Sequence, residues 1–387
     1  MRRLALATSL SLLVACQPTA QSPTAADANT PTTTQAPAAF AFEEADIASL
    51  QKQMADGSLS SRTLTQAYLD RIAAIDDAGP TLNAVIETNP DALKDAGALD
   101  AERKAGKLRG PLHGIPVLLK DNIDALPMVN SAGSLALASH KPKTDAFLVA
   151  KLREAGAVIL GKTNLSEWAN FRSTRSTSGW SGRGGQTHNP YALDRNPCGS
   201  SAGTGSAIAA NLAAVGIGTE TDGSILCPSA VAGLVGIKPT VGLVSRSGII
   251  PISSSQDTAG PMTRSVADAA ALLTAIAAAD DSDAATREYV ARAAIDYTTH
   301  LKADALKGAR IGVVRKLTGY QPDTDAAFVR AIAAMKAAGA TVVDAEIPTL
   351  GQWDKDEFEV LLYEFKAGLN DYLASSGAPH KTLADLI

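Results

Sequence analysis

Two segments rich in glycine and serine constrain this 387-residue chain more than any other feature. They are residues 196–205, with the sequence NPCGSSAGTG, and residues 218–228, with the sequence GTETDGSILCP. Glycine tolerates positive φ angles and lets the backbone approach a ligand closely, so serine hydroxyls in such segments can lie on exposed turns. Upstream, Lys120 ends an apolar run and can act as a base if its surroundings suppress its charge.

The composition predicts a globular protein that does not bind nucleic acid. Hydrophobic residues make up 45% of the chain, which allows a sizeable core. The net charge is −5, and no run of lysine or arginine exceeds two residues, so no basic stripe is present. No metal or other cofactor is expected, because ligand spacing is absent among the five histidines, His113, His140, His188, His300 and His380.

Apolar periodicity alternates between helical and extended patterns along the chain. Spacings of three and four residues predict amphipathic helices over 46–54 and 64–75, and the continuous apolar run 115–119 predicts a buried strand. Further helices are predicted at 146–155, 208–215, 265–278 and 326–338, and further strands at 157–160, 234–237, 310–314 and 341–345. This alternation predicts an α/β fold whose sheet is covered by helices on both faces.

Three segments, in order, resemble the signature blocks of the amidase signature family. They read GPLHGIPVLLKDN at 110–122, CGSSAG at 198–203 and TDGSI at 221–225. The resemblance continues through residues 236–240, 245–248 and 257–264, and covers about residue 42 to the end of the chain. It implies that residues 42–387 form one catalytic domain on a large twisted mixed sheet. It also implies a hydrolase that cleaves a carboxamide C–N bond through an acyl-enzyme.

The resemblance assigns the catalytic side chains. Amide hydrolysis needs an activated nucleophile and a proton donor for the leaving nitrogen. Ser224 matches the family's nucleophile, and Ser200, 24 positions upstream, matches the serine that follows a cis peptide bond and relays a proton. Lys120 matches the base. A free lysine has a pKa near ~10.4, so burial or hydrogen bonding must lower the pKa of Lys120.

By the same resemblance, the backbone N–H groups of Thr221, Asp222, Gly223 and Ser224 form the oxyanion hole. The sequence departs from the family here, because Asp222 takes the first of two positions often held by glycine, and Leu226 replaces a frequent arginine. A carboxylate next to a developing oxyanion is unfavourable. We therefore expect the side chain of Asp222 to face away from the site.

The substrate is expected to be a small amide or an amidated peptide. The arrangement ETDGSI at 220–225, together with WSGRGG at 180–185 and NPY at 189–191, is similar to the peptide amidase branch of the family. This similarity suggests substrates whose carboxy terminus is an amide.

The amino terminus predicts export. Residues 1–16, MRRLALATSLSLLVAC, have a positive start and a short apolar stretch that is too short to span a bilayer. Residues 13–16 resemble a bacterial lipobox, so residues 1–15 are predicted to be a signal peptide and Cys16 a lipidated first residue. An ordinary signal peptide that contains a cysteine is the alternative. Gln17 favours the outer membrane, which predicts anchoring on the periplasmic side.

Residues 16–41 and the two remaining cysteines carry further expectations. Residues 16–41 are rich in Thr, Ala, Pro, Gln and Ser and are predicted to be a flexible tether. Cys198 and Cys227 either pair in an oxidising compartment or remain two small buried thiols, and the sequence does not decide between these states.

The sequence also carries an expectation about the end of the chain. The segment TLAD at 382–385 has the form of a capped helix start just before the chain stops at Ile387. Family members typically continue further, so a chain truncated at its carboxy terminus is expected.

Other functions fit parts of the sequence. Residues 199–203 match the G-x-S-x-G elbow of α/β-hydrolases, with Ser201 as the nucleophile of an esterase, but the preceding polar segment 191–197 does not read as a strand. Phosphate binding by the Gly/Ser segments is another possibility, but neither segment ends in the Gly-Lys-Ser/Thr sequence of a phosphate-binding loop. A catalytically silent lipoprotein that binds amidated peptides is a further alternative. An amidotransferase subunit acting on transfer RNA is another, against which the export signal argues.

Overall fold

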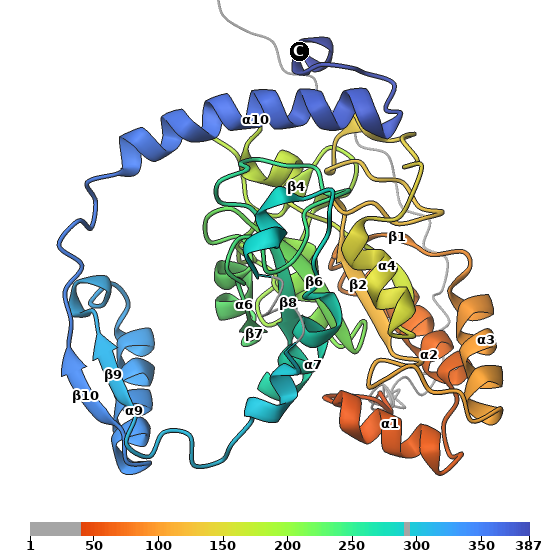
Figure 1. Cartoon of the computed structure of the whole chain (residues 1–387), viewed down its shortest axis with the longest axis horizontal. Coiled ribbons are helices and arrows are strands. Elements are labelled where there is room, and N and C mark those ends of the chain that lie inside the picture. Colours follow the sequence, from red (N-terminus) through yellow and green to blue (C-terminus); the bar gives the residue numbers. More distant parts are fainter. Residues whose placement is uncertain (1–39, 290–294) are drawn as a thin grey trace, which may run out of the picture. The chain divides into compact units, whose positions relative to one another are not determined.

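The computed structural model describes residues 40–289 and 295–387 (Figure 1). The predicted signal peptide, the predicted lipidation site Cys16 and residues 17–39 of the predicted tether lie outside the described residues. The chain divides into two units, Met1–Ala41 and Phe42–Ile387, and the second unit carries the elements that follow. Among the described residues, no helix combines the length and the apolar character that a membrane crossing requires.

A six-stranded mixed sheet lies at the core of the second unit, in the order β1-β3-β2-β6-β8-β7. Its strands are β1 (Val85–Thr88), β2 (Pro116–Lys120), β3 (Val158–Thr163), β6 (Val215–Glu220), β7 (Val235–Gly236) and β8 (Thr258–Thr263). β2 is parallel to β3 and β6, whereas β1–β3, β6–β8 and β7–β8 are antiparallel pairs. Every residue of β2, β3, β6 and β8 is buried, so the predicted α/β fold with a sheet covered on both faces is confirmed.

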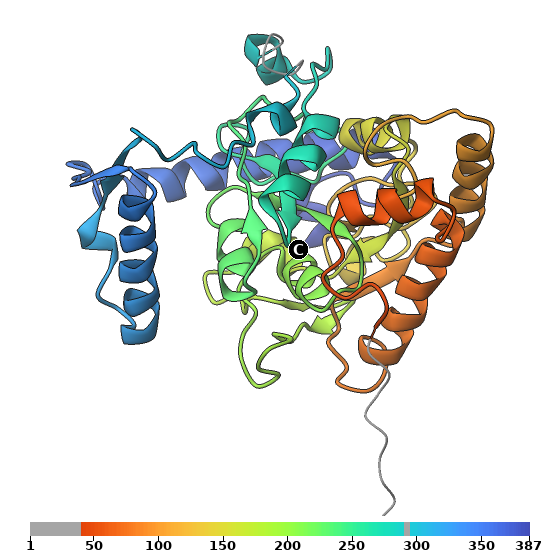
Figure 2. The same cartoon turned by 90° about the horizontal axis from the view of Figure 1, so that it is seen from below.

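Helices surround this sheet (Figures 1 and 2). α5 packs against β2, β3, β6 and β8, α7 packs against β7 and β8, and α2, α3 and α4 contact β3. The helices are α1 (Ile47–Ala55), α2 (Ser61–Ile75), α3 (Ala92–Lys104), α4 (Phe147–Glu154), α5 (Ala202–Ala209), α6 (Leu226–Val231) and α7 (Val266–Ile276).

Side-chain caps begin several helices close to the predicted positions. Asp46 and Ser60 cap α1 and α2, each by accepting a hydrogen bond from a backbone N–H of the first turn. Ser265 caps α7 in the same way, accepting from the N–H of Asp268. The Asp268 carboxylate accepts a hydrogen bond from the N–H of Ile47 at 3.0 Å. This bond joins α7 to α1.

The predicted helix over residues 208–215 is wrong. α5 starts earlier, at Ala202, and ends at Ala209, while Val215 begins strand β6. Residues 206–215 are all buried, and the apolar run continues across the turn between α5 and β6. The spacing of apolar residues therefore does not show where the helix ends and the strand begins. Gly203 lets α5 pack closely, since a Cβ there would lie 2.3 Å from the carbonyl oxygen of Ala84.

The strands predicted at 310–314 and 341–345 and the helix predicted between them are confirmed and form a β-α-β unit. It consists of β9 (Arg310–Val313), α9 (Pro322–Ala337) and β10 (Thr341–Asp344). The two strands pair in parallel, and α9 packs against β10 (Figure 1). They form a two-stranded sheet of their own rather than extending the six-stranded sheet.

The 23-residue helix α10 (Asp354–Ser376) packs through its carboxy-terminal half. Phe365, Leu369 and Leu373 share a buried cluster with Ile250 and Ile252, so this half of α10 covers the segment before β8 (Figure 1). The predicted cap at Thr382 is present and forms a full capping box with Asp385. Short elements are β4 (Trp180–Ser181), β5 (Gly185–Gln186) and the 3-10 helices Leu135–Leu137, Glu167–Asn170, Ala284–Tyr289, Tyr297–His300, Arg315–Leu317 and Leu383–Leu386.

Candidate active site

Lys120 lies at the carboxyl end of β2, between β3 and β6. Because β2 and β6 are parallel, their carboxyl ends meet at one edge of the sheet, where ligands bind in many α/β folds. The Lys120 ammonium donates a hydrogen bond to Ser200 Oγ at 2.7 Å and another to the carbonyl oxygen of Thr219 at 3.1 Å. The structure therefore brings together the predicted base and the predicted relay serine.

Burial sets the protonation of Lys120. Its side chain is completely buried, and removal from water lowers its pKa from 10.5 to about 7. The negative charges of Asp257 and Glu220 oppose this shift, because they favour the protonated form. With a pKa of about 7, a large fraction of Lys120 is neutral near neutral pH and can accept a proton.

Ser200 and Ser224 line one cavity of about 450 Å³. Ser200 follows a cis peptide bond from Gly199, as the family resemblance implied, and is buried immediately before α5. Ser224 lies in the loop between β6 and α6 and is 7% exposed. Among the hydrogen bonds of the described residues, none joins the two hydroxyls. Catalytic hydrogen bonds of this kind can form when substrate binds.

The loop that carries Ser224 is shaped by Glu220, the last residue of β6. Its buried carboxylate accepts hydrogen bonds from the N–H groups of Gly223 at 2.9 Å, Ile225 at 2.7 Å and Leu226 at 2.9 Å. Sequence reasoning did not single out Glu220. A glutamate within a Gly/Thr segment carries no spacing signal for this role.

The N–H of Gly223 does not have the role that was predicted for it. It was expected in the oxyanion hole, but Glu220 already accepts it, so Gly223 is not a free donor here. For the N–H groups of Thr221, Asp222 and Ser224, no acceptor occurs within the described part of the chain, which leaves them available. Asp222 is exposed and does not line the cavity, so its carboxylate faces away as predicted.

Ser201 does not occupy the position of a nucleophile. It is completely buried, and its Oγ donates to the carbonyl oxygen of Thr219 at 3.1 Å and accepts from the Thr219 N–H at 3.2 Å. It does not line the cavity, and residues 191–199 contain no strand that could end in an elbow. The esterase alternative therefore lacks its structural basis.

Comparison with known proteins identifies the family. The amidase family model matches residues 63–386. The chain belongs to the amidase family. A probable amidase of Arabidopsis thaliana is 44% identical over 355 residues, which cover 90% of this chain and 68% of that protein.

Solved structures agree with this assignment. The native peptide amidase of Stenotrophomonas maltophilia is 60% identical with a TM-score of 0.87, over 90% of this chain and 71% of that one. A peptide amidase bound to the competitive inhibitor chymostatin is 60% identical with a TM-score of 0.88, over 89% and 71%. Together these matches support an enzyme that hydrolyses carboxamide C–N bonds.

The amidase contains a disulfide between Cys198 and Cys227, which the sequence left open. Their Cα atoms are 5.9 Å apart, and the two cysteines are 29 positions apart in the sequence. Both are partly exposed. Across residues 40–289 and 295–387, no group of three or more His, Cys, Asp or Glu side chains is placed to hold a metal ion.

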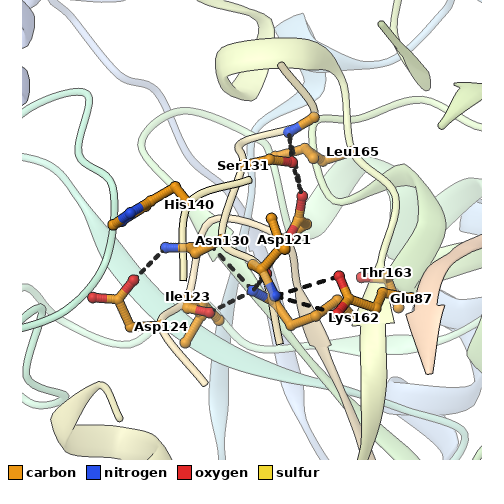
Figure 3. A network of polar contacts seen from close by, with 12 residues as sticks. Glu87, Asp121, Ile123, Asp124, Asn130, Ser131, His140, Lys162, Thr163 and Leu165 are labelled. Carbon is orange, nitrogen blue, oxygen red and sulfur yellow. Dashed lines mark hydrogen bonds and ion pairs between the residues drawn. The ribbon is translucent and has the colours of Figure 1, made fainter. Parts of the chain in front are cut away.

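A second buried lysine lies beside the site and was not predicted. Lys162 is on β3, the strand next to that of Lys120, and is completely buried (Figure 3). Its ammonium lies 3.2 Å from the Asp121 carboxylate and donates to the carbonyl oxygen of Ile123 at 2.6 Å. Asp121 also pairs with Arg183 at 3.3 Å. This network holds the chain of the amidase immediately after Lys120.

Tyr372 of α10 joins the cavity wall to the same region. Its hydroxyl donates to Asp124 at 2.7 Å and accepts from the amide nitrogen of Asn130 at 3.0 Å. Asn130 in turn accepts from Lys162 at 3.1 Å (Figure 3). Burial raises the pKa of Asp124 to about 6. A single tyrosine in a helical pattern gives no sequence signal for this contact.

Proposed function

We propose that this amidase removes the terminal amide nitrogen from peptides whose carboxy terminus is an amide. One observation carries the proposal: the buried amine of Lys120, with a pKa of about 7, lies 2.7 Å from the hydroxyl of Ser200, and Ser200 lines the same cavity as Ser224. The similarity to two peptide amidase structures supports the substrate class. We assign Ser224 as the nucleophile, Ser200 as the relay and Lys120 as the base.

The geometry supports a two-step mechanism. Neutral Lys120 takes the Ser200 proton while Ser200 takes that of Ser224, and Ser224 Oγ then forms a bond to the carboxamide carbon. The N–H groups of Thr221 and Ser224, two residues that line the cavity, stabilise the oxyanion. Collapse of the tetrahedral intermediate breaks the C–N bond, and the proton held by Lys120 returns through Ser200 to the leaving ammonia. Water then cleaves the ester by the same proton path and releases the peptide acid.

The cavity suits one end of a peptide. Its volume of about 450 Å³ lies within the usual range for small-ligand sites. One wall is the segment 249–254, which combines apolar side chains with serines, and the other includes Tyr372 of α10. A carboxamide can therefore reach Ser224 while the adjacent side chain of the peptide contacts an apolar wall.

Ammonia release from an amidated dipeptide tests the proposal. We expect turnover by the unaltered enzyme, no turnover by Ser224→Ala, and losses on the order of 10²-fold or more for Ser200→Ala and Lys120→Ala. Ser201→Ala is the matched control and should lose far less activity per folded molecule. An inactive but folded Ser201→Ala protein beside an active Ser224→Ala protein would contradict the assignment. So would a wild-type enzyme that binds the dipeptide amide without releasing ammonia, the result expected of a silent lipoprotein.

We also propose that the chain is exported and anchored by a lipid on Cys16, on the periplasmic side of the outer membrane. The support is the sequence pattern of residues 1–17. Incorporation of a labelled fatty acid that Cys16→Ser abolishes is the expected result. An unmodified mature amino terminus by mass spectrometry would rule the anchor out.

A further inference from the structure

Both cysteines of the disulfide lie next to the proposed catalytic serines. Cys198 precedes Ser200 by two positions, and Cys227 follows Ser224 by three. The bond therefore joins the loop of the relay serine to the loop of the nucleophile. These loops come from different elements, since one leads into α5 and the other leads from β6 into α6.

The disulfide acts together with hydrogen bonds that join the relay-serine loop to the segment before the nucleophile. In the described structure no hydrogen bond connects Ser200 Oγ with Ser224 Oγ, although proton transfer requires them to come within hydrogen-bond reach. The Ser201 N–H donates to the Ser224 carbonyl oxygen at 3.1 Å, and both Ser201 Oγ and the Lys120 amine donate to the carbonyl oxygen of Thr219, each at 3.1 Å. Among these links the disulfide is covalent, and it joins residues within three positions of each proposed catalytic serine.

The backbone of Cys198 also needs support. Its φ angle is 56°, in the left-handed region that non-glycine residues adopt at a cost and keep only where their surroundings hold them. One support is the side chain of Asn196, which accepts the Cys198 N–H at 2.8 Å. The bond to Cys227 is the second.

We propose that the Cys198–Cys227 disulfide positions Ser200 relative to Ser224, so that turnover of the amidase depends on an oxidising environment. This inference rests on the proposed function of the two serines. A dithiol reductant would supply two electrons and two protons, breaking the S–S bond into two thiols while the reductant forms its own disulfide. Both cysteines are partly exposed, which gives a small dithiol access.

Loss of the bond should affect the chemical step more than substrate binding. The cavity walls at 249–254 and on α10 are held by contacts that do not involve the cysteines. Misplacement of a reacting group by about 1 Å can lower a rate on the order of 10²-fold. We expect kcat to fall by about 10-fold or more in the reduced protein, with KM changed much less.

The experiment uses the full chain with Cys16→Ser, so that Cys198 and Cys227 are the remaining cysteines of the three. Thiol titration under denaturing conditions should find no free thiol before treatment with dithiothreitol and two afterwards. Peptide-amide kcat and KM are then measured, per molecule shown to be folded by circular dichroism. Re-oxidation should restore kcat. A Cys198→Ala/Cys227→Ala variant should match the reduced enzyme and should not respond to dithiothreitol.

The outcomes separate this inference from the proposed function. Two free thiols in the untreated protein would overturn the inference, as would a folded, reduced enzyme whose kcat stays within about twofold of the oxidised value. An oxidised enzyme that does not hydrolyse peptide amides would instead refute the proposed function. Turnover per total protein could instead fall only in proportion to the folded fraction, with kcat per folded molecule unchanged. The bond would then serve only stability, and this result would also overturn the inference.

Discussion

Replacing Lys120 by methionine should abolish turnover and yet stabilise the folded protein at acidic pH. Burial lowers the pKa of Lys120 from 10.5 to about 7. At about 1.4 kcal/mol per pKa unit, holding the charged lysine in the fold costs about 5 kcal/mol below pH 7. Methionine avoids this cost but gives up two hydrogen bonds worth about 1 kcal/mol each. The expected gain at pH 6 is therefore about 3 kcal/mol.

The sign follows from proton binding. Between pH 7 and pH 10.5 the unfolded chain binds more protons at Lys120 than the folded chain does, so the free energy of unfolding rises with pH across this window. At pH 9 the remaining cost of the lysine is about 2 kcal/mol, which the two lost hydrogen bonds offset. The stability advantage of Lys120→Met should thus shrink from about 3 kcal/mol at pH 6 to near zero at pH 9.

Urea unfolding followed by circular dichroism at the two pH values measures this difference. Lys162→Met is a matched control, because Lys162 is equally buried but pairs with Asp121 at 3.2 Å. Its removal leaves the buried Asp121 carboxylate with Arg183 as its remaining cationic partner and should destabilise the protein, by at most about 3–5 kcal/mol. The reasoning fails if Lys120→Met is less stable than wild type at pH 6, or if its advantage is the same at both pH values. It also fails if kcat/KM of the wild type does not rise with pH near 7.

Two further substitutions test the packing around the site, each against a control. Gly203→Ala should destabilise by several kcal/mol or prevent folding, because its Cβ would lie 2.3 Å from a backbone oxygen, whereas Gly97→Ala, with open space in α3, should be neutral or stabilising in thermal unfolding. Tyr372→Phe should cost about 1–3 kcal/mol in urea unfolding because it removes a partner of buried Asp124, while Tyr363→Phe, 73% exposed on the same helix, should cost almost nothing. Equal effects within either pair would contradict the contacts described.

The base and the relay could be predicted because their signals are local. Lys120 ends an apolar strand, and Ser200 and Ser224 lie in glycine-rich segments whose order matches a family. The structure places Lys120 and Ser200 in direct contact, and Ser224 on the same cavity. Their catalytic roles remain predictions. Most strands of the sheet and most helices around it were also predictable, because the apolar spacing and the capping residues that indicate them lie within short segments of the sequence.

What the sequence could not show depends on contacts between distant segments. The salt bridge of Lys162 with Asp121 and the bond of Tyr372 to Asp124 join residues far apart in the chain. The acceptor of the Gly223 N–H is a glutamate side chain whose direction no pattern encodes. The boundary between α5 and β6 was missed because both elements are buried on all sides there, which removes the polar residues that normally reveal a period.

The position of Lys120 on β2 has a consequence for how this amidase can change. β2 has a hydrogen-bonded neighbour on each side, so moving the strand that carries the lysine would require opening the centre of the sheet, a high-energy fluctuation close to global unfolding. One wall of the cavity, in contrast, comes from α10, a helix outside the sheet that can loosen locally. Substitutions on α10 can therefore reshape which amides enter while the dry environment that keeps the base neutral stays intact. In this fold, the range of amides that enter the cavity can therefore change during evolution without a change in the basicity of Lys120.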